Sequence, residues 1–84
     1  MPTKPITSKW RTENDELVKE IEFADFDAAF EFMKCAAIVI ADHNHHPSWT
    51  NSYNKVVIRL CTHDASNTIT QKDWSLANAL DELI

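Results

Sequence analysis

Hydrophobic and polar residues alternate over residues 16–23, and this spacing of two predicts a β-strand with one mostly wet face. The positions that share its other face are Leu17, Lys19, Ile21 and Phe23. A shorter strand is expected at residues 9–12, and the polar residues 13–15 between the two are typical of a turn. We therefore expect residues 9–23 to form a hairpin.

The spacing then changes to steps of three and four, which predicts a helix from Asp25 to about Ile40. Asp25 is a suitable N-cap because its carboxylate can accept a hydrogen bond from the first turn. Pro47 follows shortly after and prevents the helix from continuing through it. The helix face that we expect in the core consists of Phe26, Phe30, Met33, Ala37 and Ile40.

Residues 53–62 form the clearest strand pattern, with Val56, Ile58 and Leu60 on one side. Thr70 and Asp73 resemble a capping box that starts a last helix, with Asp in the place usual for Glu. That helix is expected to pack Leu76, Ala77, Leu80 and Leu83. The order strand, strand, helix, strand, helix predicts a two-layer α+β domain, an antiparallel sheet with both helices on one face.

The chain has 84 residues, which we interpret as a single domain over residues 1–84, with residues 1–8 as a flexible arm. A domain this small buries too little surface to be very stable alone, so oligomerisation is expected. No apolar leader follows Met1, and the longest apolar run, residues 35–41, is too short to cross a bilayer. We therefore expect a cytoplasmic protein that does not enter a membrane.

Charge and composition exclude further classes. The net charge is −5 and the eight Lys and Arg residues are scattered, which argues against direct binding of nucleic acid. Glycine is absent, so a glycine-dependent phosphate loop is excluded. Cys35 and Cys61 are interpreted as reduced thiols rather than as a disulfide.

All four histidines lie in two short segments, residues 43–46 and His63. Three interpretations are open. Imidazoles can exchange protons near neutral pH, which indicates acid–base catalysis. His43-x-His45 with a third histidine could instead bind a metal. His43 can also cap the negative end of the preceding helix, and this structural role suits it best.

A common site requires these two segments to meet. They flank the main predicted strand, and its ends are about 30 Å apart if the strand is extended. Residues 45–49 must therefore fold back alongside the strand. Residues 48–51 could do so as a short paired strand, or the segment could curl over the sheet as a loop.

Four motifs, in their order and spacing, resemble the pterin-4a-carbinolamine dehydratase family. They are His45-His46-Pro47-Ser48-Trp49, Tyr53-Asn54-Lys55-Val56, Thr62-His63-Asp64-Ala65 and Thr70-x-x-Asp73. The resemblance runs from about Trp10 to the C-terminus. It implies an α+β fold, a homodimer or homotetramer, and no metal or organic cofactor. It also implies removal of water from a 4a-hydroxytetrahydropterin substrate, which gives a quinonoid dihydropterin in tetrahydrobiopterin recycling.

The resemblance assigns roles to individual residues. Its paired histidines correspond to His45 and His46 and its third to His63, and one of the pair and the third are the family's acid and base. Pro47, Thr62 and Asp64 correspond to positions that line the pterin pocket. The family usually has an acidic residue where this chain has Ala41, and we expect the adjacent Asp42 to substitute for it at the substrate. The loop after His63 also lacks the usual glycines.

A non-catalytic function is the alternative interpretation. Relatives act as dimerisation cofactors of a homeodomain transcription factor or as assembly factors of carbon-fixing enzymes, and a fold does not dictate its function. The three retained histidines favour the enzyme, whereas Ala41 favours the assembly role.

Overall fold

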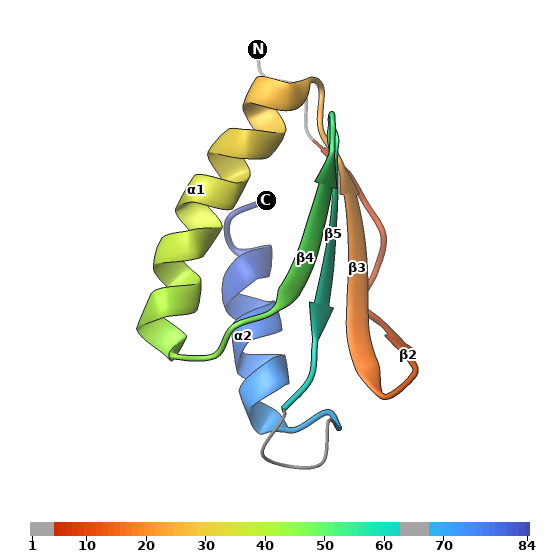
Figure 1. Ribbon diagram of the computed structural model, residues 1–84, viewed down its shortest axis with the longest axis vertical. Coiled ribbons are helices and arrows are strands. Elements are labelled where there is room, and N and C mark those ends of the chain that lie inside the picture. Colours follow the sequence, from red (N-terminus) through yellow and green to blue (C-terminus); the bar gives the residue numbers. More distant parts are fainter. Residues whose placement is uncertain (1–4, 63–67) are drawn as a thin grey trace.

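An antiparallel sheet of five strands carries two helices on one of its faces (Figure 1). The computed structural model describes residues 5–62 and 68–84, and these counts refer to them. The α+β class predicted from the sequence is thus confirmed. The elements are β1 (Ile6–Thr7), β2 (Arg11–Glu13), β3 (Glu16–Glu22), α1 (Phe26–His43), β4 (Ser48–Ser52), β5 (Lys55–Leu60) and α2 (Gln71–Asp81).

The strand order is β1-β3-β5-β4, and β2 also pairs with β3. β1 and β2 lie one after the other along the same edge of β3, with Ile6 opposite Glu22 and Arg11 opposite Val18. Pairing at residues 6–7 places part of the expected arm in the sheet, whereas residues 1–4 lie outside the described residues. The flexibility of the arm stays a prediction.

The β2–β3 hairpin turns at Asn14 and Asp15, as expected. Both residues have positive φ, 51° and 62°, a conformation that Asn and Asp tolerate better than most residues. On the sheet face without helices, Glu13 bonds to Arg11 at 3.2 Å and to Arg59 at 3.3 Å. Hydrogen bonds from Arg11 first, and then from Arg59, lower the pKa of the Glu13 carboxyl.

Helix α1 begins as predicted, because the Asp25 carboxylate accepts a hydrogen bond from the Ala28 backbone N–H at 2.8 Å. It continues to His43, three residues beyond the predicted end, and Asn44 closes it with a φ of 49°. The predicted core face was wrong for most of its residues. Phe26 and Phe30 are 42% and 50% exposed, whereas the buried positions are Ala29, Phe32, Ala36 and Ile40.

The strand predicted over residues 53–62 is shorter, and a second strand precedes it. Tyr53 has a φ of 53° and lies in the turn between β4 and β5 rather than in a strand. Register places Ser48 opposite Arg59 and Trp49 opposite Ile58. Of the two arrangements considered for residues 48–51, the short paired strand is therefore the one that forms.

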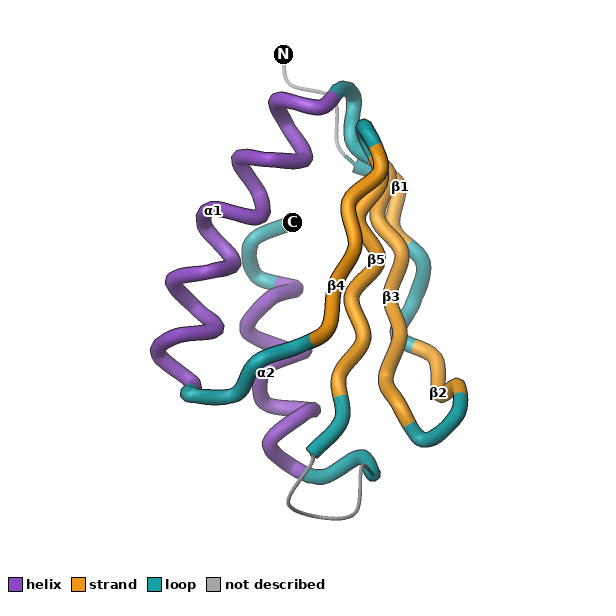
Figure 2. Tube along the Cα trace, viewed as in Figure 1, coloured by secondary structure: helices purple, strands orange, loops and turns teal. Residues whose placement is uncertain are grey.

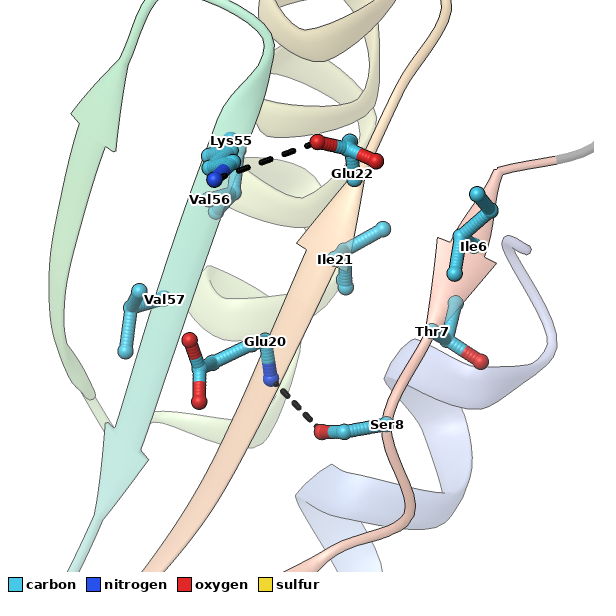
Figure 3. Close-up of a pocket in the computed structure, with 9 residues that line it drawn as sticks. All are labelled: Ile6, Thr7, Ser8, Glu20, Ile21, Glu22, Lys55, Val56 and Val57. Carbon is cyan, nitrogen blue, oxygen red and sulfur yellow. Dashed lines mark hydrogen bonds and ion pairs between the residues drawn. The ribbon is translucent and has the colours of Figure 1, made fainter.

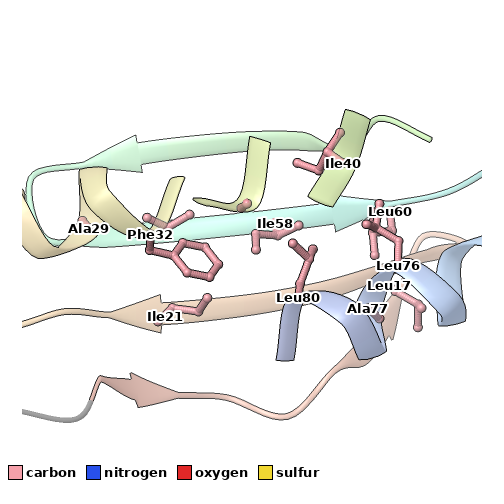
Figure 4. Close-up of a cluster of buried hydrophobic side chains, with 12 residues drawn as sticks. Leu17, Ile21, Ala29, Phe32, Ile40, Ile58, Leu60, Leu76, Ala77 and Leu80 are labelled. Carbon is pink, nitrogen blue, oxygen red and sulfur yellow. The ribbon is translucent and has the colours of Figure 1, made fainter. Parts of the chain in front are cut away.

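The core lies between the sheet and the two helices, which run along the same side of the sheet (Figure 2). Figure 4 shows how side chains from β3 and β5 meet those of α1 and α2. The largest fully buried side chains of the core are Leu17, Ile21, Ile58, Leu60, Leu76 and Leu80. Leu83, which was expected to pack in this core, follows the end of α2 and is 39% exposed.

One charged pair ties the sheet to the end of α2. Lys19 is only 7% exposed, and its Nζ lies 2.8 Å from Asp81 Oδ1. The same oxygen accepts a hydrogen bond from Trp10 Nε1 at 3.0 Å. Pairing offsets the cost of burying the ammonium group, which explains a lysine on the core face of β3.

Across the described ranges, no helix is both long and apolar enough to span a bilayer.

Candidate functional site

A hollow of about 510 Å³ lies where the α1–β4 connection, the chain after β5 and the start of α2 come together. Residues 44–48 form one side of it. Thr62 and Lys72 line it from the other elements. Of the residues expected at the site, His45, His46, Pro47 and Thr62 are thus brought to one place.

The register of β4 against β5 explains this convergence. Because the two strands are antiparallel and Ser48 lies opposite Arg59, the residues before Ser48 run beyond the end of β5. His45 therefore approaches Thr62 and not the distant turn at Tyr53. The separation of about 30 Å considered for an extended strand does not apply to this pair, because the chain has folded back.

A buried carboxylate joins the elements that meet here. Asp73 has no exposed surface, and its Oδ1 lies 2.5 Å from His45 Nε2. Its Oδ2 accepts hydrogen bonds from Thr62 Oγ1 and from the Thr70 backbone N–H, each at 2.8 Å. Thr70 Oγ1 lies 2.6 Å from Thr62 Oγ1 and completes the network. His45 is accordingly well held, with a side chain only 12% exposed.

Asp73 is the site residue that the sequence analysis missed. The motif Thr70-x-x-Asp73 was interpreted as a capping box, and that prediction is confirmed. The contact with His45 spans 28 positions of the chain, so local spacing could not reveal it. The only local feature at this position was Asp where a capping box usually has Glu or Gln, and it indicates the cap rather than the contact.

His46 occupies a different environment, since it is exposed and lines two neighbouring hollows. The second hollow has about 280 Å³ and is formed by α1 and β4, with Ala37, Ile40 and Trp49 as its apolar lining. Pro47 lines both hollows too. A polar and an apolar surface therefore meet at His46 and Pro47, an arrangement common in sites for small molecules.

The end of α1 holds the remaining residues of the histidine segment. His43 Nδ1 donates a hydrogen bond to the Val39 carbonyl oxygen at 2.9 Å, in agreement with its expected role at the helix end. Ala41 and Asp42 are exposed in the last turn, and α1 runs through them to His43. Asp42 is not among the residues that line the hollow, so its contact with substrate stays a prediction.

Two expected site residues, His63 and Asp64, lie outside the described residues. The roles assigned to them stay predictions. Among residues 5–62 and 68–84, no three His, Cys, Asp or Glu side chains are placed to hold a metal ion.

Cys61 lies beside the site, between the end of β5 and Thr62. Burial, followed by the nearby charges of Glu16 and Asp73, raises the pKa of its thiol. A thiol must lose its proton to act as a nucleophile, so this environment does not favour a catalytic cysteine at neutral pH.

Another hollow, of about 380 Å³, lies on the sheet face that carries no helix (Figure 3). It is bordered by Ile6, Glu20 and Val57. Lys55 and Glu22 line it as well, with 3.9 Å between the ammonium nitrogen and a carboxylate oxygen. The residues lining this hollow include no histidine, so proton exchange near neutral pH is better served by the hollow at His45.

These observations describe a small α+β protein with two adjacent histidines at a hollow beside one end of its sheet. A family model described as "Pterin 4 alpha carbinolamine dehydratase" matches residues 3–83. The chain therefore belongs to the pterin-4-alpha-carbinolamine dehydratase family. It is 51% identical over 76 residues to a protein of Solibacter usitatus provisionally named as such a dehydratase, covering 90% of this chain and 79% of the relative. A similarly named protein of Metallosphaera sedula is 46% identical over 74 residues, with 88% and 76% covered.

Solved structures agree with this assignment. A transcriptional coactivator/pterin dehydratase from Brucella melitensis superposes with a TM-score of 0.82 and 33% identity, covering 88% of this chain and 80% of that one. A pterin dehydratase-like protein identified as a RuBisCO assembly factor in the alpha-carboxysome has a TM-score of 0.77 and 19% identity, covering 90% and 89%. The latter likeness bears on the fold alone.

Proposed function

We propose that this protein is a 4a-hydroxytetrahydropterin dehydratase that works by histidine acid–base catalysis in tetrahydrobiopterin recycling. The observation that carries the proposal is the convergence of His45, His46 and Thr62 on one hollow, next to the position of His63 in the chain. Membership of the family supports the choice of a pterin as substrate.

The reaction needs two proton transfers. The bond between the 4a-carbon and its hydroxyl oxygen breaks, and the hydroxyl leaves as water after it receives a proton from an imidazolium. The neighbouring ring nitrogen forms a double bond to that carbon and gives its own proton to a neutral imidazole. A histidine can serve in either state near neutral pH, so a set of histidines around one substrate suits both steps.

In this proposal one histidine of the pair 45–46 and His63 are the acid and the base. Pro47, Thr62, Asp64 and Asp42 contact the pterin. The hollow of about 510 Å³ falls within the size range of small-molecule sites, which supports its use for a ligand of this kind. No metal or organic cofactor takes part, in keeping with the family resemblance.

The test supplies synthetic 4a-hydroxytetrahydropterin and follows its dehydration by ultraviolet absorbance. We expect the wild-type protein to exceed the spontaneous rate, and His63→Ala to lose about a hundredfold or more of that enhancement, the usual contribution of a general acid or base. His43→Ala is the matched control, because His43 bonds to its own helix and should leave the rate unchanged.

Two results would overturn the proposal. Equal rates for wild type and His63→Ala, both at the spontaneous level, would remove the catalytic function. Loss of wild-type activity on addition of EDTA would instead contradict the metal-free reaction.

The second candidate is an assembly or dimerisation cofactor without catalysis, and one feature of α1 favours it. Phe26 and Phe30 stack at 5.7 Å between ring centroids, and they are 42% and 50% exposed. Large apolar side chains grouped on one surface usually mark an interaction site. We propose a second copy of this chain as the occupant, since a domain of 84 residues gains stability by oligomerising as a homodimer or homotetramer.

A further inference from the structure

The buried carboxylate of Asp73 makes more contacts than its helix requires. Its bond to the Thr70 backbone N–H completes the capping box of α2 and uses Oδ2 alone. The other oxygen, Oδ1, lies 2.5 Å from His45 Nε2 in a different element of the chain. A helix cap does not explain this second contact. Burial of a charged group is costly unless it is fully hydrogen-bonded, and His45 supplies the donor that Oδ1 needs.

The hydrogen bonds around Asp73 have one consistent direction. Thr62 Oγ1–H and the Thr70 backbone N–H both donate to Oδ2, because a carboxylate oxygen can only accept from them. Thr62 has a single hydroxyl hydrogen, so Thr70 Oγ1–H must be the donor in the bond between the two threonines. The carboxylate is thus surrounded by donors, and His45 Nε2–H is the donor that completes the set at Oδ1.

This direction fixes which ring nitrogen of His45 carries a hydrogen when the ring is neutral. A neutral imidazole carries its hydrogen on one ring nitrogen and a lone pair on the other. With the hydrogen held on Nε2 by Asp73, the lone pair of His45 is on Nδ1. His45 lines the hollow, and because Nε2 is bonded to Asp73, Nδ1 is the ring nitrogen left to exchange a proton with a bound molecule.

We propose that Asp73 is a positioning residue that holds His45 as its Nε2–H tautomer and leaves Nδ1 as the nitrogen that serves the substrate. The inference rests on the proposed dehydratase function. Asp73 itself does not touch the pterin, and it acts through the orientation and tautomer of His45. A carboxylate behind a catalytic imidazole is known to act in this way in other enzymes.

Substitution Asp73→Asn tests the tautomer directly. Its amide oxygen can still accept from Thr62 and Thr70, but its NH₂ group then faces His45 Nε2 and donates to it. The hydrogen of the neutral ring must move to Nδ1, which can no longer accept a proton from substrate. We expect long-range ¹H–¹⁵N NMR in alkaline buffer to show His45 as the Nε2–H form in wild type and the Nδ1–H form in Asp73→Asn. His45→Ala identifies the signal.

The kinetic expectation follows from the same exchange. Asp73→Asn should lower kcat for dehydration about tenfold or more, because proton transfer at Nδ1 is impaired. KM should change little, since Asp73 makes no contact with substrate. Thr70→Ala is the matched control, because it weakens the cap of α2 but keeps the Asp73–His45 bond. It should lower Tm and leave the Nε2–H signal of His45 in place.

A second substitution keeps the proposal testable if Asp73→Asn does not fold. Asp73→Glu retains the acid usual for a capping box but moves the carboxylate by one methylene away from its present place. We expect a folded protein with a mixed tautomer signal and a lowered kcat. An unchanged tautomer and kcat in a folded Asp73 variant would overturn the inference. A wild-type protein without dehydratase activity would overturn the proposed function alone, because the NMR result is independent of turnover.

Discussion

At the scale of single residues, three histidines within four positions of the chain have three different environments. His43 donates to the carbonyl oxygen of Val39 in its own helix, and His45 is held by a buried carboxylate. His46 is exposed between a polar and an apolar hollow. Identical side chains in one short motif are therefore distinguished by their contacts and not by their spacing.

The two thiols differ in the same manner, and their reactivity can be predicted. Burial, together with the negative charges of Glu16 and Asp73, raises the pKa of Cys61, whereas Cys35 is exposed. Because the thiolate is the reactive form, iodoacetamide at pH 8 should modify Cys35 well before Cys61. Mass spectrometry of the modified protein over time measures both rates.

In the variant Cys35→Ser, only the modification of Cys61, the cysteine expected to react more slowly, is measured. Modification of Cys61 should accelerate as the pH is raised above the ordinary range of a thiol, since the thiolate then becomes populated. A Cys61 that reacts at pH 8 as fast as Cys35 does in wild type would contradict its described environment.

At the scale of elements, the sequence predicted where α1 lies better than how it is oriented. The N-cap Asp25 is a local signal, and it placed the helix start correctly. The side that faces the core was misjudged because most of residues 26–40 are apolar, so several faces of the helix look equally hydrophobic. Ala29 and Ala36 are buried, and these small residues allow a close approach to the sheet at the expense of Phe26 and Phe30.

This orientation leads to a prediction about assembly. Phe30 is 50% exposed on the apolar side of α1, so Phe30→Glu should prevent the association of copies proposed for this surface. Sedimentation analysis is expected to give a dimer or tetramer for wild type and a mass reduced by half or more for Phe30→Glu. Asn78→Glu, at an exposed position of α2, is the matched control and should keep the wild-type mass.

The same variant also tests whether dehydration depends on this interface. A Phe30→Glu variant that dehydrates 4a-hydroxytetrahydropterin normally would show that the enzyme does not need this interface. A wild-type protein that is monomeric at micromolar concentration would contradict the role given to this side of α1.

The β2–β3 hairpin provides a prediction about pH. Hydrogen bonds from Arg11 and Arg59 lower the pKa of Glu13 in the folded protein below its ordinary value of 4.5. A carboxyl with a lowered folded pKa stabilises the fold above the unfolded pKa, and this stabilisation is lost as the pH falls through the folded pKa. Glu13→Gln should therefore lower Tm at pH 7, and the difference should vanish as the pH falls well below 4.5.

Thermal unfolding followed by circular dichroism over a pH series measures this effect. High salt should narrow the difference at pH 7, because the charges involved are partly exposed and are screened by ions. A difference in Tm that is the same at acid and neutral pH would show that the ion pairs of Glu13 are not its cause.

At the scale of the whole molecule, the candidate site lies where three elements meet at the end of β5 (Figure 1). The motifs and their spacing were sufficient to identify the family and the fold class. The convergence of His45 with Thr62 could not be derived from them, because it depends on the pairing register of β4 with β5. The contact between Asp73 and His45 depends in turn on where α2 starts above that end of the sheet.

The central claim is that this chain catalyses the dehydration of a 4a-hydroxytetrahydropterin through its histidines. The most direct test adds wild-type protein in catalytic amounts to an excess of synthetic substrate and records the ultraviolet absorbance in a stopped-flow instrument. We predict many turnovers per chain, a rate proportional to protein concentration, and loss of the enhancement in His63→Ala but not in His43→Ala. A decay at the spontaneous rate, whatever the concentration of wild-type protein, would contradict the claim.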